Sequence, residues 1–262
     1  MKKIVVVLAL AGVFITPVTQ AKEWKEVVIA TDATYPPFES LAPDGTLVGF
    51  DVDLANAVCA EMKVKCKIVN VGWDGLIPGL VAKKHDALWA SMNITDERKK
   101  AVDFSNPYYR MQNRFVAKKG ANIVISKEGL KGKTIAVQTA TVHDNFVTKQ
   151  FGDVATIKRY LGAGEPYLEL LNGRADLHFG FIVQINEGFL SKDGNDKSFA
   201  LIGPTYTGKD DKTLGQGVAV AVRKQDKELR ELLNSGLAAV KKNDTFKKIN
   251  DKYFSFDLSG GE

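Results

Sequence analysis

Residues 30–58 read ATDATYPPFESLAPDGTLVGFDVDLANAV, a strand–loop–strand–helix unit that contains acidic residues and an aromatic ring. Asp32 and Tyr35 follow a short apolar strand that we expect at 27–30, and Asp51 lies where a second short strand runs into an apolar-periodic helix. We therefore expect Asp32 and Asp51 to face one cleft, with the ring of Tyr35 beside them. Carboxylates and an aromatic face are suited to holding a cationic or planar group.

Around this unit, short apolar strands alternate with helical patterns, which predicts an α/β fold with mostly parallel sheets and helices on both faces. Strands are expected at 27–30, 65–71, 87–90, 115–118, 134–138, 156–160, 177–180 and 217–222, and helices at 52–62, 76–83, 95–102, 142–150, 165–172, 182–190, 227–242 and 244–254. The last strand and helices need a partner sheet, and the first unit is the natural one. We therefore expect a discontinuous first lobe, 22–110 plus 204–262, an inserted second lobe, 111–203, and a ligand cleft at the hinge.

The beginning of the chain is typical of a secretory signal peptide. Met1-Lys2-Lys3 is followed by twelve uncharged, mostly apolar residues at 4–15 and by a small residue, Ala21. Twelve apolar residues are too few to span a bilayer. We therefore expect cleavage of residues 1–21, export to the periplasm and a soluble, monomeric product.

Composition argues against two other classes of function. The formal net charge is +5, but the basic residues are scattered and do not interleave with aromatic residues, so no nucleic-acid partner is expected. The two cysteines, Cys59 and Cys66, most simply form one disulfide in an exported chain. Two thiols without a nearby His or acidic cluster do not make a metal site, and we expect neither a metal nor a cofactor.

The segment ASMNITDER at 90–98 forms a second candidate site. Thr95 is a good N-cap, so Arg98 lies one turn into a helix whose start points back at the strand that ends at Ala90. Free N–H groups and a guanidinium together suit a carboxylate. The alternative is a surface Arg98 that pairs with Glu97 or Asp103.

The segment QTATVHD at 138–144 is another strand-to-helix junction, in the second lobe. The backbone N–H groups of Thr141 and Val142 are placed to meet the same carboxylate from the other side. His143 either reaches into the cleft or caps the helix. Trp73, before another helix start, is either a wall of the pocket or a core residue.

The histidines do not form a catalytic arrangement. His85 follows two lysines and is expected at the surface, whereas His178 is expected to pack within a strand. Nucleophile-elbow and phosphate-loop motifs are both missing from the sequence. A catalytic function is therefore disfavoured.

These segments resemble the periplasmic amino-acid-binding proteins of ABC importers, and most of all the histidine-binding and lysine/arginine/ornithine-binding group. The likeness runs in order from 27 to 257 and includes TDATYPPFES, GFDVDLANAVC, WDGLIPGL, SMNITDERKKAVDFSNPYY, LKGKTIAVQ and KINDKYFSFD. It implies a two-lobed periplasmic-binding-protein fold of type II that closes over its ligand.

The resemblance also implies roles for individual residues. Arg98 would clamp an α-carboxylate, helped by Ser91 and the backbone of Val142. Asp32 would meet a cationic side chain on which Tyr35 stacks, and Asp51 would add negative potential. The implied ligand-binding set is Asp32, Tyr35, Asp51, Trp73, Ala90, Ser91, Met92, Asn93, Arg98, Gln138, Thr141, Val142, His143 and Phe181.

Two residues depart from that group. Ala90 stands where a Ser is frequent, and Phe181 stands where an Asp pairs with the ligand's α-ammonium. Because an unpaired buried ammonium is costly, either another acceptor substitutes or the α-nitrogen is modified. Octopine- and nopaline-type opine binders are similar in this respect and in the loop 138–143, so an opine or another N-substituted amino acid is an alternative ligand.

The sequence therefore predicts a non-enzymatic periplasmic receptor that captures a cationic amino acid of the arginine, lysine, ornithine or histidine type and delivers it to an ABC permease. An alternative of another class is an enzyme on the same scaffold, similar to the cyclohexadienyl dehydratases. Turnover of prephenate or arogenate would distinguish the two.

Overall fold

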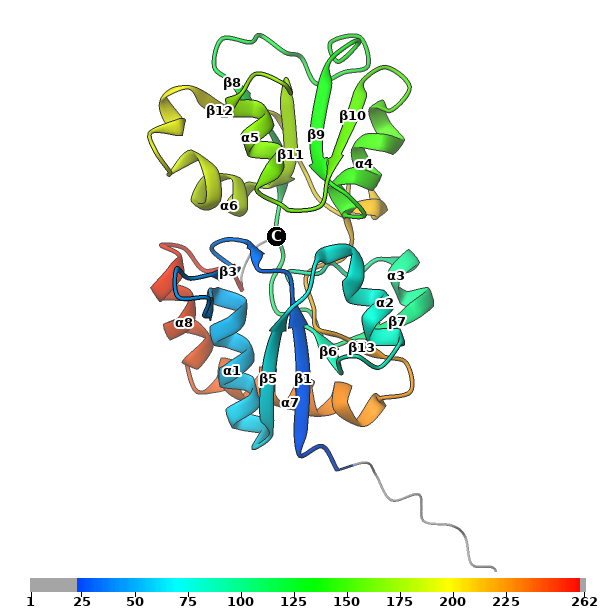
Figure 1. The fold of residues 1–262 in the computed structure, drawn as a ribbon, viewed down its shortest axis with the longest axis vertical. Helices are drawn as coiled ribbons and strands as arrows, with labels where there is room; N and C mark the ends of the chain where they lie inside the picture. Colours follow the sequence, from blue (N-terminus) through cyan, green and yellow to red (C-terminus); the bar gives the residue numbers. More distant parts are fainter. Residues whose placement is uncertain (1–22, 260–262) are drawn as a thin grey trace, which may run out of the picture.

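The computed structural model describes residues 23–259, so the signal peptide predicted at 1–21 lies outside the described residues. The described chain forms two lobes, one above the other in Figure 1, each built around a five-stranded sheet. Residues 105–112 and 207–220 link the two sheets. Within the described part of the chain, no helix combines the length and apolar character needed to cross a bilayer.

The lower sheet has the strand order β5-β1-β6-β13-β7. Its strands are β5 (Lys65–Asn70), β1 (Glu26–Thr31), β6 (Ala87–Leu88), β13 (Ala221–Arg223) and β7 (Val102–Phe104). The strand β1 pairs in parallel with β5 and β6, whereas β13 is antiparallel to β6 and β7.

The upper sheet repeats this arrangement in the order β10-β9-β11-β8-β12. Its strands are β10 (Thr156–Tyr160), β9 (Thr134–Gln138), β11 (Leu177–Phe181), β8 (Asn113–Lys118) and β12 (Phe199–Tyr206). The strand β9 is parallel to β10 and β11, and β8 is antiparallel to β11 and β12.

The predicted two-lobed α/β architecture is confirmed: in each sheet four strands run in one direction, and a single strand, β13 or β8, runs against both of its neighbours and makes the sheet mixed. The cause is the route of the chain between lobes. Strands β8 and β13 are the first strands after the chain crosses from one lobe to the other. Each begins near the cleft, where the parallel strands end, and therefore runs in the opposite direction. The lobe boundaries stay predictions; β12 continues to Tyr206, past the expected boundary at residue 203.

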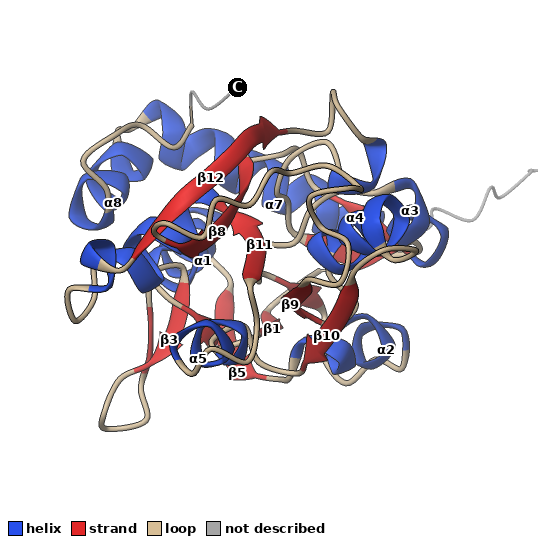
Figure 2. Cartoon of the chain, turned by 90° about the horizontal axis from the view of Figure 1, so that it is seen from above, coloured by secondary structure: helices blue, strands red, loops and turns tan. Residues whose placement is uncertain are grey.

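Helices flank the strands on both sides, as the view from above shows (Figure 2). The lower lobe carries α1 (Phe50–Met62), α2 (Leu76–Val81), α3 (Asp96–Ala101), α7 (Lys227–Lys242) and α8 (Thr245–Tyr253), and the upper lobe carries α4 (Val142–Phe151), α5 (Glu165–Leu171) and α6 (Ile182–Ile185). A π-helical turn, Asn186–Leu190, extends α6, and 3₁₀ turns lie at Trp73–Gly75, Asn195–Lys197 and Lys212–Leu214.

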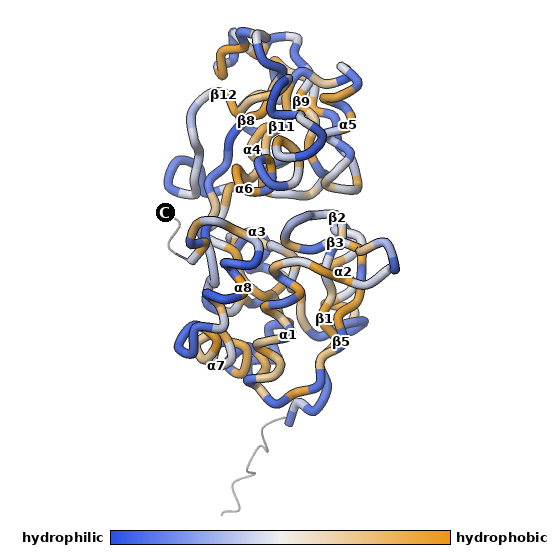
Figure 3. Tube along the Cα trace, turned by 90° about the vertical axis from the view of Figure 1, so that its left-hand side faces the viewer, coloured by the Kyte–Doolittle hydropathy of each residue, from blue (hydrophilic) through white to orange (hydrophobic). Residues whose placement is uncertain are grey.

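The lower core shows why these helices form. Apolar residues recur every four positions along α7 at Leu229, Leu233 and Leu237, and they join Leu54 and Val58 of α1 in one buried cluster. Burying each such side chain contributes about 1.5–3 kcal/mol. Figure 3 shows hydrophobic stretches along the strands of both lobes and hydrophilic loops at their outer edges.

A small third sheet joins the start of α1 to the cleft. Its strands are β2 (Thr34–Tyr35), β3 (Glu39–Leu41) and β4 (Leu47–Val48). The sequence analysis expected a short strand before the helix, which is β4, but missed β2 and β3, because strands this short carry no readable alternation. Phe50 N and Asp51 N donate to the carbonyls of Pro37 and Phe38, at 3.0 and 2.9 Å. These bonds fix where the first turn of α1 lies.

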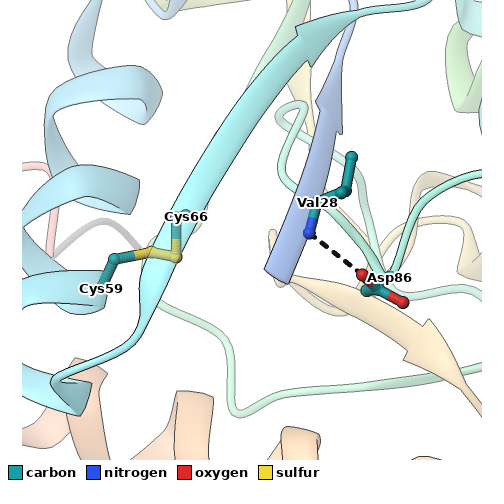
Figure 4. The surroundings of a disulfide bond; sticks show 4 residues. All are labelled: Val28, Cys59, Cys66 and Asp86. Carbon is teal, nitrogen blue, oxygen red and sulfur yellow. Dashed lines mark hydrogen bonds between the residues drawn. A yellow bond between two sulfur atoms is a disulfide. The ribbon is translucent and has the colours of Figure 1, made fainter. Parts of the chain in front are cut away.

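The predicted disulfide is present between Cys59 of α1 and Cys66 of β5, with an S–S distance of 2.00 Å (Figure 4). On the other side of β5 in the same view, Val28 N donates to Asp86 Oδ2 at 3.0 Å. The two contacts tie α1 and the loop before β6 to the edges of β5 and β1.

We expect Gly49→Ala to destabilise the protein by more than about 3 kcal/mol. Gly49 has φ +132°, and a Cβ there would lie 2.2 Å from the carbonyl oxygen of Phe38. The clash would push the start of α1 away from β3. Gly45→Ala is the control, because Gly45 also has a positive φ, +83°, but open space around it, and strain alone costs about 1–2 kcal/mol. Urea unfolding measures both, and equal losses would contradict this account.

Candidate functional site

Strand ends from both lobes meet at one cavity. Asp32 follows β1, Ala90 and Ser91 follow β6, Gln138 ends β9 and Phe181 ends β11. The lining residues are Asp32, Tyr35, Glu39, Trp73, Ala90, Ser91, Asn93, Arg98, Gln138, Thr141, Val142, His143 and Phe181. The structure thus brings together every predicted site residue except Asp51 and Met92, and it adds Glu39; that they bind a ligand stays a prediction.

Arg98 forms the basic side of the cavity. Thr95 caps α3 and accepts from Arg98 N at 3.2 Å, as the sequence predicted. Arg98 Nη1 donates to the carbonyl of Asn93 at 2.9 Å, and the Arg98 guanidinium lies 5.1 Å from the ring centre of Trp73. Burial lowers the pKa of Arg98 to about 10, which leaves it charged at neutral pH.

The alternative, in which Arg98 lies at the surface and pairs with Glu97 or Asp103, does not hold in the structure. Glu97 pairs with Lys100 at 2.5 Å and Asp103 pairs with Arg230 at 3.3 Å. Within residues 23–259, no carboxylate forms a salt bridge with Arg98, so its charge faces the cavity without an acidic partner from the protein. Val142, at the first position of α4, lies on the same cavity wall and presents a helix N-terminus.

Asp32 and Glu39 form the acidic side. Asp32 is 4% exposed and accepts from Gln138 Nε2 at 2.9 Å and from Thr34 Oγ1 at 3.1 Å. Burial raises the pKa of Asp32, and these hydrogen bonds oppose the rise. Tyr35 stands beside it and meets the ring of Phe181 in the other lobe edge-on, with the ring centres 6.4 Å apart.

Asp51 does not face the cleft, which corrects the sequence prediction. It is 1% exposed and lies under the cavity wall, where its Oδ2 accepts from Ser91 N and from Tyr108 OH, both at 2.9 Å. The reason is a contact between segments distant in sequence: the first turn of α1 points Asp51 at the turn after β6, where Ser91 has φ +49°. The carboxylate is therefore held by the protein.

Glu39 is the acidic residue that sequence reasoning missed. It is 1% exposed, lines the cavity, and accepts from Ser91 Oγ at 3.3 Å. The sequence offered only one hint, that Glu39 lies in the same segment as Asp32. Because this segment was interpreted as a loop, the direction of the Glu39 side chain could not be predicted. Burial first, and then the neighbouring Asp51 and Asp32, raise the pKa of Glu39 well above its usual range.

The remaining predicted residues divide between wall and core. Met92 is 1% exposed and packs in the apolar cluster under β6, so it supports the site from behind. Trp73 is a wall residue, half-buried, and its Nε1 donates to the carbonyl of Ala140 at 3.2 Å. Asn93 is 5% exposed and lines the cavity between Ser91 and Arg98.

The histidines take three different places. His143 is buried on the cavity wall with Nε2 2.9 Å from Asn113 Oδ1, while Thr141 caps the helix. His178 packs within β11 with Nδ1 2.8 Å from the carbonyl of Ala136, as predicted. His85 was expected at the surface, but it is 3% exposed with Nε2 2.8 Å from the carbonyl of Leu76. That carbonyl, at the start of α2, gives the ring a buried partner.

The two lobes touch across the cavity. Besides the Gln138–Asp32 and Trp73–Ala140 bonds, Arg98 Nη2 donates to the carbonyl of Ala140 at 3.4 Å, and Ala163 N donates to Thr34 Oγ1 at 3.2 Å. Donors and acceptors come from opposite lobes in each case. The structure is therefore a closed form.

Comparison with known proteins agrees with this architecture. Residues 27–256 match the model of the bacterial extracellular solute-binding proteins, family 3. The chain belongs to this family. It is 43% identical to the L-arginine-binding protein of Pseudomonas aeruginosa over 99% of each chain, and 38% identical to the histidine-binding periplasmic protein of Escherichia coli K12 over the full length of both.

A solved structure gives the same result for the fold. An ancestral arginine-binding protein bound to arginine superimposes with a TM-score of 0.80 at 34% identity, covering 88% of this chain and 99% of its own. The resemblance seen in the sequence is thus confirmed at the level of the family.

We expect the ligand-free protein to lose stability as the pH rises above about 6.5; below that pH the buried His143 and His178, whose pKa values are lowered to about 3 and about 4, oppose the effect of the carboxyls. Burial raises the pKa of Asp51 to about 6 and that of Glu39 well above its usual range. Groups with a raised folded-state pKa stabilise the fold at low pH, and the contribution disappears as the pH passes through that pKa. The slope is at most about 1.4 kcal/mol per pH unit for each proton.

Urea unfolding at a series of pH values measures this slope. Glu39→Gln should flatten it, because one of the two adjacent carboxyls is gone, whereas Glu23→Gln, at an exposed position, should leave it unchanged. A Glu39→Gln profile that runs parallel to the wild type would count against the shared burial of the pair.

Proposed function

We propose that this protein captures a cationic amino acid in the periplasm and delivers it to an ABC permease. One observation carries the proposal. The cavity has a guanidinium without an acidic partner on one side, Arg98, and buried carboxylates without a basic partner on the other, Asp32 and Glu39, within the described chain. A molecule with a carboxylate at one end and a cation at the other satisfies both.

The proposed binding mode follows from this polarity. The α-carboxylate meets Arg98 and the N-terminus of α4 at Val142, where backbone N–H groups favour an anion. The distal ammonium or guanidinium meets Asp32 and Glu39, and the ring of Tyr35 provides a face for it. The names of the relatives, which are arginine- and histidine-binding proteins, support this ligand class.

Delivery to a permease rests on closure of the two lobes. The interlobe bonds of Asp32, Trp73, Arg98 and Thr34 join the lobes only in the closed form, so closing creates one continuous outer surface. We propose that a permease distinguishes this surface from that of the open form. The relatives named above are binding proteins, and the role proposed here is non-enzymatic and monomeric.

An opine, or another N-substituted basic amino acid, is the second candidate ligand. The observation in its favour is Phe181, an apolar residue 3% exposed at the end of β11, where the resemblance leads one to expect a carboxylate for the α-ammonium. The α-nitrogen of an opine is still protonated, but the carboxylate of its N-substituent offsets that charge at the wall. The distal cation and its acidic partners would be the same.

Calorimetric titration of ligand-free protein with L-arginine, L-lysine, L-ornithine, L-histidine and octopine tests the ligand class. We expect the basic amino acids with extended side chains to bind most tightly, because their distal cation reaches the carboxylates Asp32 and Glu39. Glutamine serves as the uncharged control. Absence of binding by every cationic compound would reject the proposal.

Arg98→Ala should weaken binding of the preferred ligand about thirtyfold or more. Truncating one partner of a buried hydrogen-bonded charge pair costs about 2–5 kcal/mol, since the carboxylate is left without its counter-charge. Lys100→Ala is the matched control, because Lys100 lies on the same helix but is exposed and pairs with Glu97. Unchanged affinity in Arg98→Ala would remove Arg98 from the site.

A further inference from the structure

His143 lies at the second position of α4, is 7% exposed and lines the cavity. Its ring meets that of Phe181 edge-on, with the ring centres 4.6 Å apart. The imidazole therefore stands next to the wall from which the expected carboxylate is missing. What this ring presents to a ligand depends on which of its nitrogens carries the proton.

A chain of hydrogen bonds fixes that proton. Asn113 Nδ2 donates to the carbonyl of Tyr206 at 3.0 Å, so the carboxamide oxygen Oδ1 is the atom that faces His143, 2.9 Å from Nε2. A carboxamide oxygen only accepts hydrogen bonds, and Nε2 must carry the hydrogen. In a neutral ring Nδ1 is then a bare acceptor.

The ring is neutral because its surroundings disfavour a positive charge. Burial, with smaller effects from His178 and from the guanidinium of Arg98, lowers the pKa of His143 to about 3. Within residues 23–259 no hydrogen bond from a protein donor reaches Nδ1. A neutral acceptor on the cavity wall is thus left for a ligand.

We propose that His143 Nδ1 accepts a hydrogen bond from the N–H of the ligand's α-nitrogen and so takes over the role for which Phe181 has no polar atom. This inference rests on the proposed function and refines it. A lone pair at this place favours an α-amine that keeps an N–H, and it disfavours an acidic N-substituent packed against the ring, because a carboxylate brings no donor.

Two ligands and two variants test this role. L-arginine has the α-amine, and δ-guanidinovalerate is the same molecule without it. In His143→Asn the side-chain amide reaches the position of Nδ1, whereas in His143→Gln it reaches the position of Nε2. Calorimetry gives the ratio of the two affinities for the wild type and for each variant.

We expect the wild type to prefer L-arginine over δ-guanidinovalerate, His143→Asn to keep most of that preference, and His143→Gln to lose about tenfold or more of it. Equal weakening of both ligands in His143→Gln would show a merely structural role and overturn the inference. If the wild type prefers another basic amino acid, that amino acid and its analogue without the α-amine replace this pair; if it binds no cationic amino acid, the proposed function falls and this inference with it.

A ligand-independent measurement guards against a variant that folds poorly. The ¹⁵N shifts of histidine-labelled wild-type protein report the tautomer directly. A hydrogen on Nε2 and a bare Nδ1 at His143 support the inference, as does a shift confined to Nδ1 when L-arginine is added. A hydrogen on Nδ1 in the ligand-free protein would overturn it.

Discussion

The site depends on a buried carboxylate, Asp51, that the protein surrounds with its own donors. Ser91 N and Tyr108 OH both reach its Oδ2 at 2.9 Å, so one oxygen joins α1, the turn after β6 and the segment that follows β7. Hydrogen bonds to a charged group contribute about 1.5–3 kcal/mol each. They offset the strain of Ser91, whose φ of +49° costs about 1–2 kcal/mol.

The strained turn at Ser91 decides where the basic group lies. Two residues later the carbonyl of Asn93 accepts from Arg98 Nη1, so the position of the guanidinium follows from that of the turn. Tyr109 OH also donates to Ser91 Oγ at 2.8 Å, which leaves the hydroxyl's own hydrogen for Glu39 or Asp51. One serine thus connects the two charged sides of the cavity.

Much of this was predictable from the sequence, because local signals suffice for it. Alternating strand and helix patterns placed most of the elements, although they missed β7 and β12, and Thr95 as an N-cap placed Arg98 at a strand-to-helix junction. The orientation of Asp51 and the inclusion of Glu39 were not predictable. Both depend on the small β2–β3–β4 sheet and on the turn at Ser91, which are set by contacts between segments distant in sequence.

In the proposed binding mode, Asp32 connects ligand capture with closure. Gln138 Nε2, from the upper lobe, donates to Oδ2 of Asp32, and Thr34 Oγ1 lies 3.1 Å from each oxygen. An ionised carboxylate has about four acceptor positions, so a distal cation and Gln138 can bind it at the same time. A cation also keeps Asp32 ionised, and an ionised carboxylate is the stronger acceptor for Gln138. A ligand bound in this way would therefore strengthen an interlobe bond that it does not itself make, and closure would be favoured by charge as well as by contact.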